Sequence, residues 1–514
     1  MRSIAVIFLL FIPLIGNSQE ADLIRRQADE ERKAGRYESA IALYRDALSE
    51  TDQLPDAHMG ISDAYRLSFQ YEEAERSYRK VRNTWADRFP ASIFYYGLML
   101  KMNGNFEASI DEFETFINEI GDSGRYPDFI EQAYVEKAGA ELAMFIVDEG
   151  THDLIHMNAP VNSNFNDFSP EMYGDILLLT SGRGKGWSAR KDLKYGESFM
   201  DQYAFRQEGR EWVSYDLGLL DAVNGKFHEG NGTFNSSFTK FYFTSCGDNT
   251  VHCRIFVTEQ DPDQEWSKPR PLNSRINLPG TDAKQPAVSS SGDTLIFISN
   301  RPGGAGQNDI WMSVSLGGDN WGAPVNLKEI NTSFNELSPR LAGNGILLFS
   351  SEGHQSLGGF DLYLYDMVSE ENKVVNMGMP FSSSRDDAYA VIRDSLIYFS
   401  SNRKGGLGNF DLYSLKLDQP YAFFKELFQN SPSALRSDVG RREYEEMEEA
   451  RVKLVDDPFA YEALPDRQKQ LISEVIKSRR AGRPLPSELE YLDDSEREFI
   501  LEIAAKQMKR SSGN

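Results

Sequence analysis

A glycine-bearing phrase occurs three times in the second half of this 514-residue chain. The copies are SGDTLIFISNRPGGAGQNDIWM (Ser291–Met312), AGNGILLFSSEGHQSLGGFDLYLY (Ala342–Tyr365) and RDSLIYFSSNRKGGLGNFDLYSL (Arg393–Leu415). When Ser299, Ser351 and Ser401 are aligned, an aspartate follows each of them ten residues later, at Asp309, Asp361 and Asp411. The intervals are 351 − 299 = 52 and 401 − 351 = 50 residues, a period typical of propeller blades or solenoid repeats.

Each copy has the composition of a β-hairpin. A short apolar run such as Leu295–Ile298 or Leu396–Phe399 predicts a buried strand. The following loop contains Pro302-Gly303-Gly304 or Gly405-Gly406, whose glycines can adopt the positive φ of tight turns. A second run, Asp-Ile-Trp or Asp-Leu-Tyr, predicts the returning strand. Because one such unit cannot bury both of its faces, neighbouring units must stack around an axis, as blades do.

Two weaker copies precede these three, so five blades are predicted within residues 151–419. Ile176–Arg183 leads through an insertion to Asp201-Gln202-Tyr203, and Phe241–Ser245 leads to Arg254-Ile255-Phe256. The expected fold class is a multidomain α + β chain with an N-terminal helical solenoid, a central all-β propeller and a C-terminal helical segment.

Residues 19–150 show helical spacing with a second period. Tyr37 and Tyr71 are 34 residues apart, Tyr71 and Phe106 are 35 apart, and 128–147 reads as a capping helix. This pattern resembles tetratricopeptide repeats. The geometry of that family implies a concave face at Arg25, Asp29, Met59, Asp63, Arg66, Phe94 and Lys101. These residues either hold a partner's peptide or helix, or are ordinary solvated helix positions.

The two ends of the chain differ from the repeats. Arg2, the apolar run Ile4–Ile15 and Gly16-Asn17-Ser18 have the form of a secretory signal, so we expect residues 1–18 to be removed after Ser18. No later apolar run is long enough to span a bilayer. Residues 420–514 predict a helical tail with helices at about 432–454 and 465–480 and a third near Ser495. Its apolar stripes either pack together, pack on the propeller or bind a partner.

Charge and cysteine content limit the partners. The formal net charge of −24 argues against nucleic acid and anionic lipid as main partners. Cys246 and Cys253 are the only cysteines, and they flank a loop of the second blade. In an oxidising compartment they either form a hairpin disulfide or remain two buried thiols. A spacing of six intervening residues with only His252 nearby does not make a zinc site.

The sequence shows no catalytic or cofactor motif that would make this chain an enzyme. It has no Gly-x-Ser-x-Gly, His-Glu-x-x-His or Walker-type loop. Gly182–Gly186 reads as a loop and His152 and His156 as part of a linker. We predict no metal and no cofactor. The repeated aspartates either form a ring of ligands for cations or sugars, or accept N–H groups that fix each hairpin. Equal spacing favours the structural interpretation.

The phrase Ser-Asn-Arg-x-Gly-Gly…Asp-Leu-Tyr resembles the repeat of TolB-type propellers. Together with the signal and the helical repeats, it resembles the periplasmic PorE-like family of the type IX secretion and gliding machinery. The family's peptidoglycan-gripping OmpA-like domain has no counterpart here. The resemblance implies a non-enzymatic scaffold that is exported to the periplasm, is associated with the outer membrane and binds other envelope proteins. The alternative is a propeller that binds carbohydrate or peptidoglycan.

Overall fold

The computed structural model describes residues 17–121, 126–146, 153–184, 192, 197–247, 252–343, 345–368, 374–430 and 466–481, with isolated positions between 485 and 504. Its contacts divide the chain into two compact units. One unit contains residues 1–92 and 192–196, and the other contains residues 93–191 and 197–514. The predicted signal residues 1–16 and the predicted helix at 432–454 lie outside the described residues.

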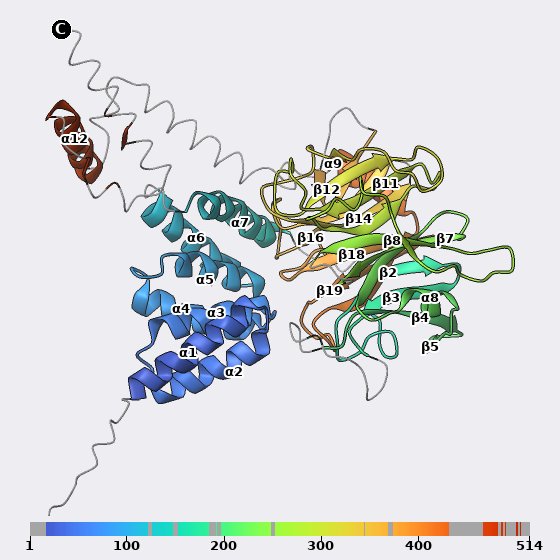
Figure 1. Cartoon of the computed structure of the whole chain (residues 1–514), viewed down its shortest axis with the longest axis horizontal. Coiled ribbons are helices and arrows are strands. Elements are labelled where there is room, and N and C mark those ends of the chain that lie inside the picture. The colour runs from blue at the N-terminus through green and yellow to red at the C-terminus, as the bar shows by residue number, and fades with distance from the viewer. Residues whose placement is uncertain are drawn as a thin grey trace, which may run out of the picture. The chain divides into compact units, whose positions relative to one another are not determined.

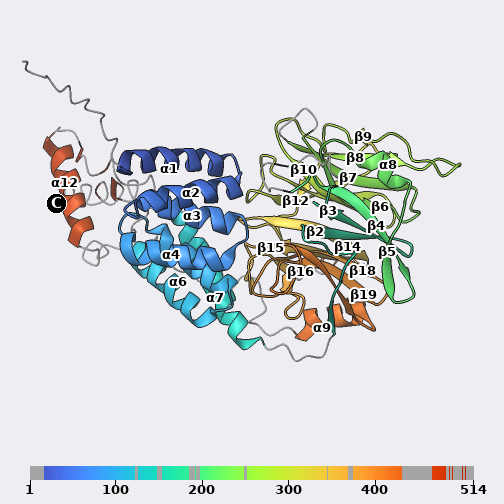
Figure 2. The same cartoon turned by 90° about the horizontal axis from the view of Figure 1, so that it is seen from below.

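The first unit is a stack of antiparallel helices. Neighbouring helices pack on one another in chain order, as Figure 2 shows: α1 (Asn17–Lys33), α2 (Tyr37–Glu50), α3 (Pro55–Leu67) and α4 (Tyr71–Trp85). The buried residues of α2 are Ala40, Ile41, Tyr44 and Ala47. Gly60 of α3 lies against the Tyr44 ring, where a Cβ would overlap the ring. A small residue therefore stands where α2 and α3 cross.

The second unit begins in the first turn of α5 and contains the propeller. Its N-terminal helices are α5 (Ala91–Met102), α6 (Phe106–Ile120) and α7 (Pro127–Phe145). The 20 strands of the described residues form five four-stranded antiparallel sheets, seen as the fan of strands in Figure 1. The prediction of five blades is confirmed.

In chain order, blade 1 contains β2 (Asp167–Tyr173), β3 (Ile176–Ser181), β4 (Asp201–Glu208) and β5 (Glu211–Ser214). Blade 2 contains β6 (His228–Phe234), β7 (Lys240–Cys246), β8 (Cys253–Glu259) and β9 (Arg270–Pro271). Blade 3 contains β10 (Ala283–Val288), β11 (Thr294–Ser299), β12 (Asp309–Val314) and β13 (Val325–Asn326). Blade 4 contains β14 (Glu336–Gly343), β15 (Ile346–Ser351), β16 (Asp361–Asp366) and β17 (Val374–Asn376). Blade 5 contains β18 (Asp387–Arg393), β19 (Leu396–Ser401), β20 (Asp411–Lys416) and β1 (Leu154–His156).

The ring is closed by the two ends of the propeller segment. The innermost strands contact each other in the cyclic order β2, β6, β10, β14, β18 and again β2. Strand β1, the first of the chain, is the outermost strand of blade 5 and pairs with β20, with Leu154 opposite Leu415. Because this pairing joins the first and last strands of the segment, blade 5 is complete and the ring of blades is closed.

The core lies between neighbouring blades. Ile296 and Ile298 of β11 pack with Leu347 and Phe349 of β15, and all four are fully buried. These are the apolar runs that identified the strands in the sequence. Stacking the blades therefore buries both faces of each β-hairpin.

Helices α5 and α7 are joined to blade 4 by buried contacts inside the second unit. Lys101 Nζ lies 2.5 Å from Glu136 Oε2 and 3.3 Å from Ser356 Oγ, and both charged side chains are almost completely buried. Gln355 Nε2 donates to the Ala138 carbonyl (2.7 Å). Leu142, Ala143 and Leu357 form an apolar cluster beside these bonds. In the fourth repeat, therefore, the loop after β15 is buried by helix α7.

The tail has two described helices. The first, α9 (Pro420–Asn430), packs on blades 4 and 5 through Phe424, which is fully buried beside Ile346 and Ile397. The second, α12 (Asp466–Ala481), matches the predicted helix at 465–480. Its Ile472 and Val475 pack with Ile500 in a separate cluster, so the apolar stripes pack together. Among the described residues, no helix combines the length and apolar character needed to cross a membrane.

Replacing Gly139 with alanine should destabilise the protein, although alanine ordinarily stabilises a helix by about 1 kcal/mol relative to glycine. A Cβ at Gly139 would overlap the Ser356 carbonyl oxygen. We expect the free energy of unfolding to fall by about 1–3 kcal/mol, the usual cost of overpacking, as measured by chemical denaturation. Gly121→Ala is the control, because no atom lies within 4 Å of that Cβ position. Equal stability of the two variants would contradict the packing of α7 on blade 4.

Candidate functional site

The three repeated aspartates close the hairpin loops. Asp361 is fully buried and accepts N–H groups from Leu357 (2.7 Å) and Gly358 (3.3 Å). Its third donor is Nδ2 of Asn376 on the outermost strand (2.7 Å). Asp309 and Asp411 each accept two N–H groups from the same places in their own loops. Their oxygen atoms are thus occupied by donors of the protein and do not form a ring of ligand carboxylates.

His156 has a structural place that the sequence analysis missed. It lies on β1, not in a linker, and its Nε2 is 2.9 Å from Asp411 Oδ2. In blades 3 and 4 the corresponding bond to the aspartate comes from Asn326 (2.8 Å) and Asn376 (2.7 Å). The linker interpretation of His156 was therefore wrong, because its strand is supplied from the other end of the propeller segment.

The residue of the innermost strand that lies opposite the serine near the end of the second strand is acidic in four blades: Asp167, Glu229, Glu336 and Asp387. Blades 1 and 5 give this carboxylate a counter-ion: Arg183 pairs with Asp167, and Arg403 pairs with Asp387 (2.6 Å). Arg183 is thus a fixed part of blade 1, although residues 185 and 186 of the predicted loop lie outside the described residues. In blade 3 the acid is replaced by Ala283, and burial lowers the pKa of Arg301 to about 10.

Blade 4 has the acid but not the arginine. Glu336 is fully buried, and burial raises its pKa to about 7. It accepts hydrogen bonds from Thr332 Oγ1 (2.6 Å) and Ser351 Oγ (2.9 Å). Burial also raises the pKa of Asp361 in the same blade to about 7. Two carboxyl groups that titrate near neutrality therefore lie in the blade that carries the helices.

The centre of the propeller is a ring of five residues with left-handed backbone. One comes from each innermost strand: Ser169, Asn231, Gln285, Ser338 and Tyr389, with φ between 50 and 59°. Each N–H is accepted by a side chain of the preceding blade. The Ser169 N–H is accepted by Ser400, the Asn231 N–H by Thr180 and the Gln285 N–H by Thr244. The Ser338 N–H is accepted by Gln285, and the Tyr389 N–H is accepted by Ser338. The strained residues are thus held in place by hydrogen bonds between blades.

These five residues line a small polar pocket on the axis, which also contains Arg340. Arg340 Nη1 lies 2.6 Å from Glu171 Oε2 of blade 1. Burial raises the pKa of Glu171, and the arginine opposes that rise. Asn231 Oδ1 is buried and has no hydrogen-bond partner among the described residues. The axis is therefore bridged by an ion pair and offers hydroxyl and amide groups beside it.

The sequence analysis did not identify the asparagines that hold consecutive blades together. Four of them lie four to six residues before an innermost strand: Asn162, Asn224, Asn277 and Asn331. Asn331 Oδ1 accepts from Ile310 N (2.8 Å) and its Nδ2 donates to Ile310 O (2.9 Å), and the others bond in the same way to Leu412, Gln202 and Ile255. Each asparagine amide thus makes the two hydrogen bonds that a backbone residue of a neighbouring strand would make. Their recurrence before every innermost strand except β18 was the available signal.

The helical residues predicted to form a concave face divide into two groups. Asp29 and Asp63, 34 residues apart, accept from Tyr44 Oη and Tyr78 Oη at 2.6 Å. Arg25 pairs with Asp29, Arg66 donates to Tyr78 Oη (3.2 Å), and Met59 is half-buried. The hydrogen bonds of this group hold consecutive helices together.

Phe94 and Lys101 do not belong to an exposed face. Both are fully buried, Phe94 among the aromatic rings of Phe113, Phe116 and Phe129. Lys101 is directed at Glu136 and Ser356. Their assignment to a concave binding surface was therefore wrong, because the last helices pack on blade 4.

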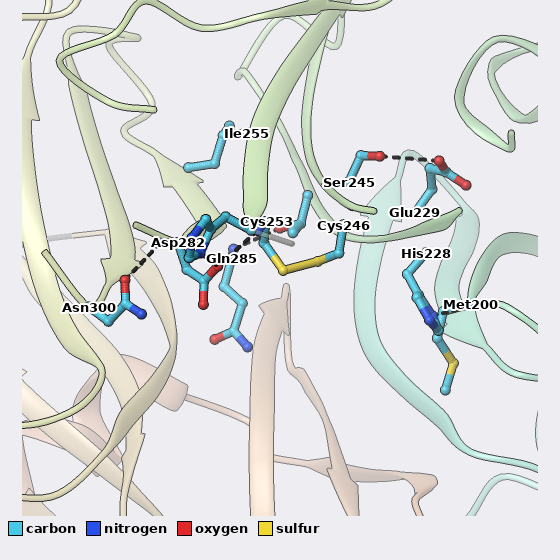
Figure 3. Close-up of a disulfide and its surroundings, with 12 residues drawn as sticks. Met200, His228, Glu229, Ser245, Cys246, Cys253, Ile255, Asp282, Gln285 and Asn300 are labelled. Atoms are coloured by element: carbon cyan, nitrogen blue, oxygen red, sulfur yellow. Dashed lines mark hydrogen bonds and ion pairs between the residues drawn. A yellow bond between two sulfur atoms is a disulfide. The ribbon is translucent and has the colours of Figure 1, made fainter. Parts of the chain in front are cut away.

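A disulfide joins Cys246 and Cys253, as Figure 3 shows. The two residues face each other at the end of β7 and β8. In the same close-up, Asp282 Oδ1 accepts the Cys253 N–H (2.9 Å), and Asn300 Oδ1 accepts the Asp282 N–H (2.7 Å). In blade 2, Arg254 replaces the loop aspartate opposite Ser245. The disulfide closes the β-hairpin that blades 3, 4 and 5 close with a carboxylate.

No family model matches the sequence, and no curated protein matches it. Among solved structures, the chain is similar to TolB from Acinetobacter baumannii, with 13% identity, 50% of this chain and 55% of that chain covered, and a TM-score of 0.28. It is also similar to β-1,2-mannobiose phosphorylase from Listeria innocua, with 11% identity and a TM-score of 0.35. That match covers 53% of this chain and 95% of the phosphorylase chain. The chain thus spans about half the length of that TolB chain. TM-scores below 0.5 assign no function, and the class is defined by the fold itself: a five-bladed β-propeller preceded by a helical region.

Replacing Asp361 with alanine should lower the melting temperature. Three buried donors lose their acceptor, which we expect to cost about 2–4 kcal/mol of unfolding free energy. Thermal unfolding monitored by circular dichroism measures this. Ser290→Ala, at an exposed position between β10 and β11, is the control. Unchanged stability together with loss of a ligand would contradict the structural role.

The stability of the protein should fall as pH rises from about 4 to 7. The pKa of Glu336 is raised to about 7 in the folded state, so the folded protein binds more protons than the unfolded chain in this range. Glu336→Gln removes this contribution and should flatten the dependence of stability on pH. Asp293→Asn is the control, because hydroxyl groups lower the pKa of Asp293 and it titrates below this range. Identical slopes for wild type and Glu336→Gln would refute the assignment.

Replacing both cysteines with serine should lower the unfolding free energy by about 2–3 kcal/mol, the value for a disulfide that closes a short loop. Chemical denaturation with and without reductant measures this, since reductant should affect the wild type and not the variant. A wild type that is insensitive to reductant would contradict the role of the disulfide in blade 2.

Proposed function

We propose that this chain is a non-enzymatic scaffold that is exported and holds other envelope proteins. The observation that carries the proposal is the joint between α5, α7 and blade 4. Its buried Lys101–Glu136 ion pair and the bonds from Gln355 and Ser356 place helices and propeller loops in one compact unit. A rigid unit that presents two kinds of surface is suited to bringing partners together.

Two further features support the proposal. The loop carboxylates are engaged by donors of the protein, so the side chains with the most regular spacing serve the fold. The disulfide agrees with an oxidising compartment and with the signal expected at residues 1–18. The helical region is proposed to be a tetratricopeptide-repeat solenoid, since Asp29 and Asp63 make the same bond 34 residues apart. Membership of a type IX secretion or gliding complex follows from the family resemblance.

Cross-linking in intact cells followed by mass spectrometry tests the scaffold. We expect cross-links from the propeller loops and from α6 and α7 of the same unit to specific envelope proteins. Gly139→Ala should weaken their joint recovery without removing either one alone. Recovery of no envelope protein from either surface would refute the proposal.

The second candidate is recognition of carbohydrate or peptidoglycan. The axial pocket is the place to test it. Ser169, Gln285, Ser338 and Tyr389 bring hydroxyl and amide groups together beside Asn231 Oδ1, which has no partner among the described residues, but the pocket volume of about 10 Å³ admits a single hydroxyl group and no sugar ring. Sedimentation with purified peptidoglycan and a glycan array test it. Binding that is lost in Asn231→Ala would favour this function over the scaffold, and absence of binding would exclude it.

A further inference from the structure

Blade 5 repeats the position that helix α7 covers in blade 4. In blade 4, Leu357 lies four residues before the loop aspartate Asp361 and donates its N–H to that carboxylate (2.7 Å). In blade 5, Leu407 lies four residues before Asp411 and donates its N–H in the same way. Blade 3 has the small residue Ala305 at this place. Blades 4 and 5 therefore present a leucine from the same point of the hairpin loop.

The two leucines differ in what covers them. Leu357 is fully buried, and it packs against Leu142 and Ala143 of α7. Leu407 is 47% exposed. One exposed leucine is common on protein surfaces and by itself indicates nothing. Here, however, the equivalent leucine of blade 4 shows that this point of the loop is one at which a helix docks.

A second residue beside each leucine follows the same pattern. The glycine after the leucine packs against the loop that leads to the next blade. A Cβ at Gly358 would overlap the Arg385 carbonyl oxygen, and a Cβ at Gly408 would overlap the Phe165 carbonyl oxygen. Arg385 and Phe165 therefore hold equivalent places. Arg385 Nη2 donates to Asn103 Oδ1 just after α5 (3.0 Å), whereas Phe165 is 40% exposed. Blade 5 thus has an exposed aromatic ring where blade 4 has an arginine bound to the end of a helix.

The exposed residues of blade 5, Leu407 and Phe165, are here called the blade 5 pair, and they adjoin the interface that α5 and α7 already make. The Cβ position of Gly104, just after α5, lies 3.9 Å from Ser384 Oγ in the loop that leads from blade 4 to blade 5. Ser401 lies opposite both Asp387 and Asp411. The loop before each of these aspartates therefore opens on the same end of blade 5, and the pair continues the surface that the helices cover.

We propose that the blade 5 pair is the docking site for an amphipathic helix of a partner protein. The chemistry of that helix is indicated by the stripe of α7 that meets blade 4, which consists of small and aliphatic residues: Ala138, Gly139, Leu142 and Ala143. A helix with such a stripe can approach a loop closely and bury a leucine and an aromatic ring beneath it. The inference rests on the proposed scaffold function and names the surface and the kind of partner that the scaffold holds.

Photo-cross-linking of the full-length protein in intact cells tests the proposal, with p-benzoylphenylalanine in place of Phe165. We expect a product with an envelope protein in which the cross-linked residue lies on the apolar stripe of a helix. Adding Leu407→Lys should lower the yield of this product at least about tenfold, because a lysine amine would be buried without a partner. Leu316→Lys is the matched control, since Leu316 is 61% exposed just after β12, at the end of blade 3 away from these loops. It should leave the yield unchanged, and all variants should keep the wild-type melting temperature.

A product with another part of this chain, or with a strand or loop of the partner, would overturn the proposal. A yield that Leu407→Lys leaves unchanged would overturn it equally, as would the absence of any product from position 165. The scaffold function fails only if the wild type recovers no envelope protein from any propeller loop or from α6 and α7. Failure of the docking site and failure of the scaffold are therefore distinguishable.

Discussion

The propeller depends on side chains that join the start of each blade to the blade before it. Four asparagines pair with the third strand of the preceding blade as a strand would. Five residues of left-handed backbone give their N–H groups to acceptors on that blade. A connecting segment has no ladder of its own, and its buried polar groups would be costly if unpaired. These polar side chains therefore let five separate sheets form one ring.

The sequence predicted the strands and their number because apolar runs and glycine loops recur with the blade period. It could not show that His156 belongs to blade 5, since its hydrogen bond with Asp411 of β20 joins residues 255 positions apart. It also assigned Phe94 and Lys101 to an exposed face. Within a helix, the pattern that places residues on one side cannot say whether that side meets solvent or another part of the chain. The contacts with Phe113 and Ser356 decide this only in three dimensions.

The loop after the second strand differs in sequence between repeats because it contacts different parts of the protein in different blades. Blades 3 and 5 keep Arg301 and Arg403 after the second strand, whereas blade 4 has Gly353. Its next residues, His354 and Gln355, are buried, and Gln355 bonds to α7. Burial raises the pKa of Glu336, and no arginine stands at the position of Arg301 or Arg403 to oppose that rise. The packing of α7 on the blade 4 loop therefore accounts both for the different sequence of the fourth repeat and for the raised pKa of Glu336.

The position of β1 has a consequence for the order of assembly. This strand is made before every other strand of the propeller, yet its partner β20 is the last. Four blades can form hairpins from residues that are near in sequence, but the fifth is incomplete until the whole segment is present. Contacts of such long range are slow to form because a large loop must close first. Ring closure is therefore the late event in maturation, and a chain truncated before residue 411 would leave β1 as an unpaired edge.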